Sequence, residues 1–170
     1  MIVPLHSSLW VTEQDLLKKE KKEHKILFIG RLSKEHKRPH LLIEAFSKVA
    51  TDYPDWIVEF WGADSNKAYK AQLELMVKQA NLSDRIFFKG VTKDIESVLN
   101  TGDIYAMMSA MEGFGLSMAE AMSKGLPVIA CNSWNGITDM VDDGITGILV
   151  QDKPEEIAQG LQKLMDNIEL

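Results

Sequence analysis

The sequence predicts an α/β fold in which helices cover both faces of a parallel sheet of about six strands, as a three-layer domain. The main observation is that short apolar runs alternate with segments of helical spacing from residue 25 onward. Such alternation is typical of right-handed βαβ units. The second observation is bulk composition: 170 residues, of which 45% are hydrophobic and 26% charged, fit one soluble domain with a substantial core.

The expected elements follow one another in strict alternation. Short apolar runs, read as buried strands, occupy residues 26–29, 56–61, 86–88, 103–108, 127–130 and 147–150. Segments of helical spacing occupy residues 39–50, 67–80, 93–99, 117–123, 137–141 and 154–166. In a parallel sheet of this type, ligands bind beyond the carboxyl ends of the strands. The loops after Ile29, Phe88, Met108 and Ala130 are therefore the candidate binding loops.

The N-terminal stretch differs from the rest. Residues 1–24 show no clean period, and residues 16–23 form a run of alternating opposite charges. A membrane-binding helix is conceivable there, but a solvated linker is the better interpretation. The sequence therefore predicts a linker over 1–24 and one folded domain over 25–170.

Composition excludes several classes of function. The formal net charge of −6 argues against a general nucleic-acid binder, which would carry net positive charge. A single cysteine, Cys131, can build neither a disulfide framework nor a zinc site alone, so a reducing, cytoplasmic environment is expected. No apolar run reaches the ~18 residues that a membrane span needs.

The loop after the first strand carries candidate anion-binding residues. Gly30 ends the strand, so Arg31 should lie at the rim of the crevice, where a guanidinium can hold a phosphate through two hydrogen bonds. Lys37 would add a mobile positive charge, with Lys34 as the alternative lysine. Taken alone, the loop is better interpreted as a solvated segment of mixed charge. A dinucleotide-binding Gly-x-Gly-x-x-Gly pattern does not follow the strand.

The loop after the fourth strand carries the strongest signal. Two glycines, Gly113 and Gly115, flank Phe114 just before a predicted helix. Glycine lets backbone approach a ligand closely, and a helix N-terminus offers unpaired N–H groups with partial positive charge. The pattern predicts a phosphate-binding corner that needs no metal. Glu112 before it and Glu120 within the helix could each accept hydrogen bonds from a sugar diol, although a structural role is the better interpretation of either one alone.

These residues carry a family resemblance. The segment from Glu112 to Glu120 resembles the E-x7-E motif of retaining glycosyltransferases of family 4, also called group 1 glycosyltransferases. The residues 30–33, Gly-Arg-Leu-Ser, resemble the family's Gly-Arg-Leu opening, and residues 141–150 resemble its closing Asp-Gly-x-Thr-Gly-x-Leu segment. The resemblance covers roughly residues 25–167, and the three motifs occur in the family's order.

The resemblance implies a GT-B arrangement, in which two Rossmann-like domains face a cleft and the C-terminal one holds a nucleotide-sugar donor. By matching positions, Arg31 and Lys37 would neutralise the leaving diphosphate as catalytic residues. Glu112 would hold the donor sugar's hydroxyls, and Glu120 the ribose diol. The other substrate-binding positions that it implies are Gly30, Val91, Gly113, Phe114, Gly115 and Leu116.

The implied reaction transfers a hexose from a nucleoside diphosphate sugar to an acceptor with retention at the anomeric carbon. The resemblance places it in polysaccharide, lipopolysaccharide or glycolipid synthesis, with no cofactor and no metal. The acceptor domain would be missing from this chain, so the domain alone would bind donor and transfer little. The full-length enzyme could work at the cytoplasmic face of a membrane. The alternatives are a non-catalytic nucleotide-sugar-binding module and a nucleotide-sugar epimerase of similar architecture.

Two departures from the family pattern affect the site. Arg38 follows Lys37 where the family usually has glycine, so the loop is expected to turn differently. Residues 134–139 read Trp-Asn-Gly-Ile-Thr-Asp, where the family often has a Gly-Gly or Gly-Pro pair followed by Glu. This second departure concerns the shape of the sugar pocket, where Trp134 would either pack in the core or stack on a sugar.

Overall fold

A computed structural model describes residues 23–167 of the chain. The predicted linker over 1–24 lies outside these residues except for Glu23 and His24, and His24 already belongs to the first strand.

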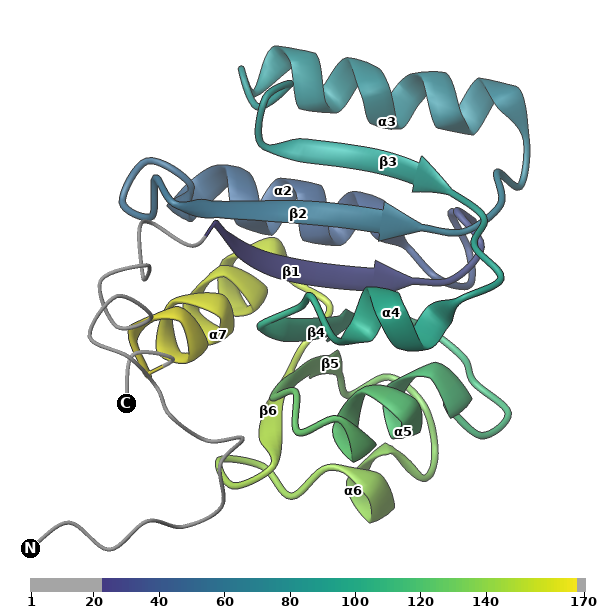
Figure 1. The fold of residues 1–170 in the computed structure, drawn as a ribbon, viewed down its shortest axis with the longest axis vertical. Helices are drawn as coiled ribbons and strands as arrows, with labels where there is room; N and C mark the ends of the chain where they lie inside the picture. The colour runs from purple at the N-terminus through teal and green to yellow at the C-terminus, as the bar shows by residue number, and fades with distance from the viewer. Residues whose placement is uncertain (1–22, 168–170) are drawn as a thin grey trace, which may run out of the picture.

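The sheet is the one predicted (Figure 1). Its six strands are β1 (His24–Ile29), β2 (Trp56–Trp61), β3 (Ile86–Gly90), β4 (Ile104–Met107), β5 (Val128–Cys131) and β6 (Gly147–Val150). They pair in the order β3-β2-β1-β4-β5-β6, and every pairing is parallel. This order is that of a Rossmann-like doubly wound sheet.

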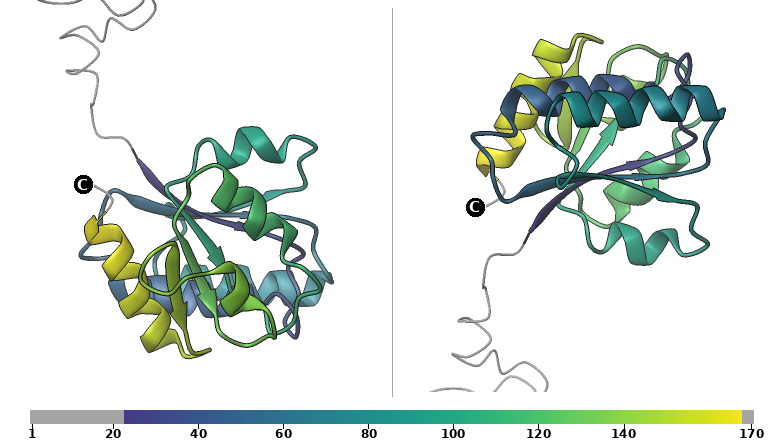
Figure 2. Two further views of the ribbon diagram at one scale, coloured as in Figure 1. Left: turned by 90° about the horizontal axis from the view of Figure 1, so that it is seen from below. Right: turned by 90° about the horizontal axis from the view of Figure 1, so that it is seen from above.

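Helices cover both faces of the sheet, as the alternating pattern predicted (Figure 2). One layer holds α2 (Pro39–Val49), α3 (Lys67–Gln79) and α7 (Pro154–Asn167), and the other holds α4 (Ile95–Leu99), α5 (Leu116–Ser123) and α6 (Ile137–Met140). The strand sequence explains the two layers. In β1, Ile26 and Phe28 join the first core and Leu27 joins the second, because successive side chains point to opposite faces.

The site's position follows from the strand order. The chain runs from β1 outward to β3 and then crosses back, so that β4 pairs with the other edge of β1. The connections after β1 and β4 therefore leave the sheet in opposite directions, and such a switch point opens a crevice at the carboxyl ends of the strands. The loops that hold Lys37 and Glu112 flank this crevice.

The neighbouring loops approach so closely that they need glycine. The Gly30 amide donates to the Trp61 carbonyl at 2.8 Å, and the Gly62 amide donates to the Gly90 carbonyl at 2.8 Å. A Cβ at Gly62 would lie 2.0 Å from the Gly30 carbonyl oxygen, which no side chain could tolerate without a backbone shift. Glycine at position 62 therefore allows the loops after β1 and β2 to pack directly together.

Candidate functional site

The loop between β1 and α2 is folded around Ser33. The Ser33 hydroxyl accepts a hydrogen bond from the Lys37 amide at 3.1 Å, and the Ser33 carbonyl accepts one from the Arg38 amide at 2.8 Å. Ser33 is buried, and its bonds satisfy backbone groups at the start of α2. The loop therefore has a defined turn just where Lys37 leaves the backbone.

Arg38 takes the conformation that glycine would favour. Its φ and ψ are 49° and 50°, in the left-handed region, which costs a non-glycine residue roughly 1–2 kcal/mol. The departure from the family pattern thus leaves the turn glycine-like. The cost is offset by the side chain: the guanidinium donates to the Met108 carbonyl at 2.8 Å and the Ser133 hydroxyl at 3.0 Å, and pairs with Asp152 at 2.5 Å.

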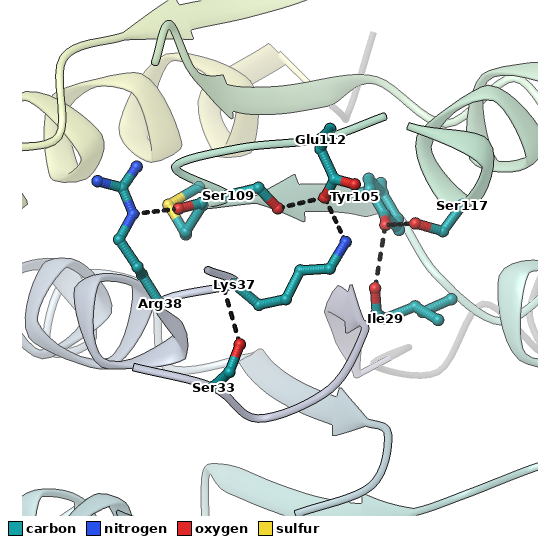
Figure 3. A network of polar contacts seen from close by, with 9 residues as sticks. Ile29, Ser33, Lys37, Arg38, Tyr105, Ser109, Glu112 and Ser117 are labelled. Carbon is teal, nitrogen blue, oxygen red and sulfur yellow. Dashed lines mark hydrogen bonds and ion pairs between the residues drawn. The ribbon is translucent and has the colours of Figure 1, made fainter. Parts of the chain in front are cut away.

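These Arg38 contacts connect the loop after β1 to the loops after β4, β5 and β6. The hydrogen bond from Arg38 holds the pKa of the Asp152 carboxyl below its ordinary value, so this ion pair is formed at neutral pH. Arg38 lies at the crevice but points away from Glu112 (Figure 3). Sequence reasoning did not assign it a role.

The centre of the site is an ion pair across the switch point (Figure 3). The Lys37 ammonium contacts the Glu112 carboxylate directly, although the two residues are 75 positions apart. The Ser109 hydroxyl donates to the same carboxylate oxygen at 2.5 Å. A Cβ at Gly30 would lie 3.4 Å from the Lys37 side chain, which is ordinary van der Waals contact, so the lysine stem runs past Gly30. The structure thus brings together three predicted residues: Gly30, Lys37 and Glu112.

The predicted phosphate-binding corner is the N-terminus of α5. Gly115 caps the helix at φ 68°, in the left-handed region that favours glycine. Its carbonyl accepts hydrogen bonds from the Met118 and Ala119 amides, both at 3.0 Å. The amides of Leu116 and Ser117 come before these first internal bonds, so they are the ones a helix N-terminus offers to an anion.

A buried tyrosine holds this helix start against the sheet. The Tyr105 hydroxyl lies 2.7 Å from the Ser117 hydroxyl, and 3.4 Å from the Ile29 carbonyl at the end of β1 (Figure 3). Burial raises the pKa of the Tyr105 phenol well above its ordinary value, so the group stays protonated and can donate. Neither Tyr105 nor Ser117 was predicted as part of the site.

Three further predicted residues line two neighbouring hollows. Arg31 and Val91 border a hollow of about 250 Å³ that also includes Trp61 and Thr92. Glu120 borders a second hollow of about 210 Å³, which shares Ile95 with the first. Glu120 is exposed on α5. Glu112 borders neither hollow, so the two glutamates of the motif lie in different places.

The loop before α5 exposes apolar side chains. Phe114 is 66% exposed and Leu116 is 67% exposed, while Gly113 has open space around it. Trp134 is half-buried, and its ring would lie 3.3 Å from a Cβ at Gly115. The Trp134 ring therefore packs against the cap of α5, which is the first of the two roles expected for it.

Comparison with known proteins identifies the family. The family model of glycosyl transferases group 1 matches residues 12–170. The chain belongs to the family of group 1 glycosyl transferases. It is 32% identical over 146 residues to an uncharacterized glycosyltransferase of Haemophilus influenzae, with 85% of this chain and 40% of that protein covered. It is 31% identical over 149 residues to a D-inositol 3-phosphate glycosyltransferase of Corynebacterium kroppenstedtii, with 84% of this chain and 33% of that protein covered.

Two solved structures are also similar to this chain. The C-terminal domain of a group 1 glycosyl transferase (LpcC) from Francisella tularensis is 33% identical with a TM-score of 0.80, covering 92% of this chain and 81% of that one. S. aureus TarM, solved in complex with UDP among other ligands, is 28% identical with a TM-score of 0.78, covering 87% of this chain and 29% of that one. The present group 1 domain spans 40% or less of the length of the curated relatives named above.

Three further observations concern the cysteine, metal binding and membrane spans in this group 1 domain. Burial raises the pKa of the Cys131 thiol to about 12, so little of the reactive thiolate forms at neutral pH. Within residues 23–167, no cluster of three or more His, Cys, Asp or Glu side chains is arranged to hold a metal ion. In that same range, no helix is both long and apolar enough to cross a membrane.

Tyr105→Phe is expected to lower the free energy of unfolding by about 0.5–1.5 kcal/mol, because it removes one hydrogen-bonding hydroxyl without changing the buried ring. The measurement is urea unfolding at pH 7. Tyr53→Phe is the matched control: its hydroxyl donates to Asp166 at 2.6 Å in an exposed contact, where water replaces the lost partner. Equal losses for the two variants would contradict a specific role for the Tyr105–Ser117 contact.

Proposed function

We propose that this chain is the donor-binding domain of a retaining glycosyltransferase that transfers a hexose from a nucleoside diphosphate sugar to an acceptor. One observation carries the proposal. A lysine and a glutamate from opposite sides of the switch point meet beside the N-terminus of α5. A cation, a hydroxyl-binding carboxylate and unpaired amides are the groups that a sugar diphosphate needs.

The leaving diphosphate would be stabilised electrostatically. Lys37 and Arg31 supply positive charge on the β1 side, and the α5 N-terminus supplies N–H groups on the β4 side. These groups would supply the positive charge that a divalent metal supplies in other enzymes. We therefore propose that the reaction needs no metal and no other cofactor.

Retention would follow from attack on the face that the diphosphate leaves. Glu112 is the carboxylate at the centre of the site, and it is engaged by Lys37 and Ser109 in the described structure. This engagement favours a role in holding the sugar over one as a nucleophile. The bond from the anomeric carbon to the phosphate oxygen would break with its electron pair on the phosphate. The acceptor oxygen would bond to the same face, and its proton would pass to a phosphate oxygen.

UDP and UDP-glucose are the first ligands to test. TarM was solved with UDP, and a 27%-identical relative from Bacillus subtilis is a poly(glycerol-phosphate) alpha-glucosyltransferase. Because this chain spans a minor part of such relatives, we propose that a separate N-terminal domain binds the acceptor. The full-length enzyme would then act in polysaccharide, lipopolysaccharide or glycolipid synthesis, in the cytoplasm or at the cytoplasmic face of the membrane.

A thermal-shift panel on the 170-residue chain tests donor binding. UDP, GDP, ADP and CMP, each with and without a matching sugar, are added in buffer containing EDTA. One nucleotide and its sugar conjugate are expected to raise the melting temperature, because a ligand that binds the native state stabilises it by mass action. The rise is expected to survive EDTA, since Lys37, Arg31 and the helix amides take the place of a metal.

Two outcomes of this panel would count against the proposal. A chain that binds none of the nucleotides lacks the donor site. A shift that EDTA abolishes would show that phosphate binding depends on a metal. Product analysis with a full-length protein that contains this domain would then distinguish sugar transfer from epimerisation and from binding without reaction.

A further inference from the structure

The lysine assigned to the diphosphate already has a carboxylate partner. The Lys37 ammonium is paired with Glu112, and the two side chains are 24% and 11% exposed. The Ser109 hydroxyl fixes the same carboxylate oxygen at 2.5 Å. A phosphate that reaches Lys37 must therefore compete with Glu112 for the ammonium.

The competition affects two ligands differently. When a free nucleoside diphosphate takes Lys37, the Glu112 carboxylate loses its cation, stays mostly buried and lies close to another negative group. When the intact donor takes Lys37, the sugar attached to the same phosphate brings hydroxyl groups that can donate to Glu112. The carboxylate is then compensated, and the cost of breaking the ion pair is largely recovered.

We infer that Glu112 is a specificity-determining residue that discriminates the intact donor against the free diphosphate product, through its competition for Lys37. This inference rests on the proposed function and goes beyond it. Holding the sugar makes Glu112 favour the donor, while competing for the ammonium makes it disfavour the product. The ion pair would re-form as the diphosphate leaves, which assists product release.

Glu112→Gln tests the inference, because it removes the charge and keeps the side-chain shape. UDP is expected to bind the variant chain roughly two- to fivefold more tightly than the wild type, the range of a partly exposed ion pair. UDP-glucose is expected to gain less or to bind more weakly, because the carboxylate no longer accepts its hydroxyls. Isothermal titration calorimetry with both ligands gives the ratio of the two affinities.

Asp64→Asn is the matched control. Asp64 is exposed in the loop after β2, where its backbone bridges to Leu32, so its loss changes the net charge equally at the same edge of the sheet. Long-range repulsion from such a charge is largely screened at high ionic strength. Asp64→Asn is therefore expected to leave the UDP affinity at 0.5 M salt unchanged, while the gain from Glu112→Gln persists.

Three results have distinct meanings. If Glu112→Gln binds UDP no more tightly than the wild type, or gains equally for UDP and UDP-glucose, the discrimination is overturned while donor binding stands. If the wild type binds neither ligand, the proposed function fails and the inference with it. Should Glu112→Gln fold poorly in a melting experiment, Glu112→Asp withdraws the carboxylate by one methylene while keeping the charge. It is expected to show a smaller gain for UDP, and no gain would overturn the inference.

Discussion

Arg31→Ala and Lys37→Ala are each expected to weaken the binding of UDP by about 1.5–3 kcal/mol, the range for hydrogen bonds to charged groups. The Lys37 variant should lie at the lower end, because the wild-type ammonium must give up its ion pair with Glu112 before it can bind the phosphate. Binding of the bare nucleoside uridine should barely change. Calorimetry with UDP and uridine measures both effects.

Lys34→Ala is the control for this prediction. Lys34 lies in the same loop and carries the same charge, but its side chain is exposed, and Lys37 is the lysine that contacts Glu112. Its replacement is expected to change UDP binding by less than about 0.5 kcal/mol. Equal losses for UDP and uridine in the Arg31 variant would mean that Arg31 acts through folding. If Lys34→Ala lost as much UDP affinity as Lys37→Ala, the effect would come from the charge of the loop in general.

Glu120→Ala is expected to weaken UDP and UDP-glucose to the same extent, by about 1.5–3 kcal/mol. The reason is that both ligands share the ribose, whose diol a carboxylate can bind through two hydrogen bonds. Glu120 borders a hollow distinct from the Lys37–Glu112 pair, so its loss should not depend on the donor sugar. Calorimetry with the two ligands measures the two losses side by side.

Glu96→Ala is the control for Glu120. Glu96 borders the same hollow, where it pairs with Lys124 on the surface, but its side chain is 70% exposed. A similar loss of affinity in the Glu96 variant would assign the effect to the charge of the hollow, not to ribose binding. A Glu120 variant that lost affinity for UDP-glucose alone would contradict the separate roles of the two glutamates.

The elements were largely predictable because their signals are local. The strands β4 and β5 are runs of apolar residues buried throughout, and Pro39 begins α2 as expected of proline in a first turn. An observed helix boundary differs from the predicted one where a side chain caps the helix. α4 begins at Ile95 and not at residue 93, because the Asp94 side chain caps the helix by accepting from the Ser97 amide at 3.0 Å.

The sequence by itself determined the fold class, the loops at the carboxyl ends of the strands and the residue types that are candidates for binding a sugar diphosphate. These follow from periodicity and from glycines at strand and helix ends, which act within a few positions of the chain. The tertiary structure alone decided that Lys37 pairs with Glu112, that Arg38 ties four loops together, and that Tyr105 supports the start of α5. Lys37 and Glu112 lie 75 positions apart, and the crossing of the chain at β1 and β4 brings them into contact. A motif can assign each residue to a ligand, but which charges neutralise one another before the ligand arrives depends on the packing of distant loops.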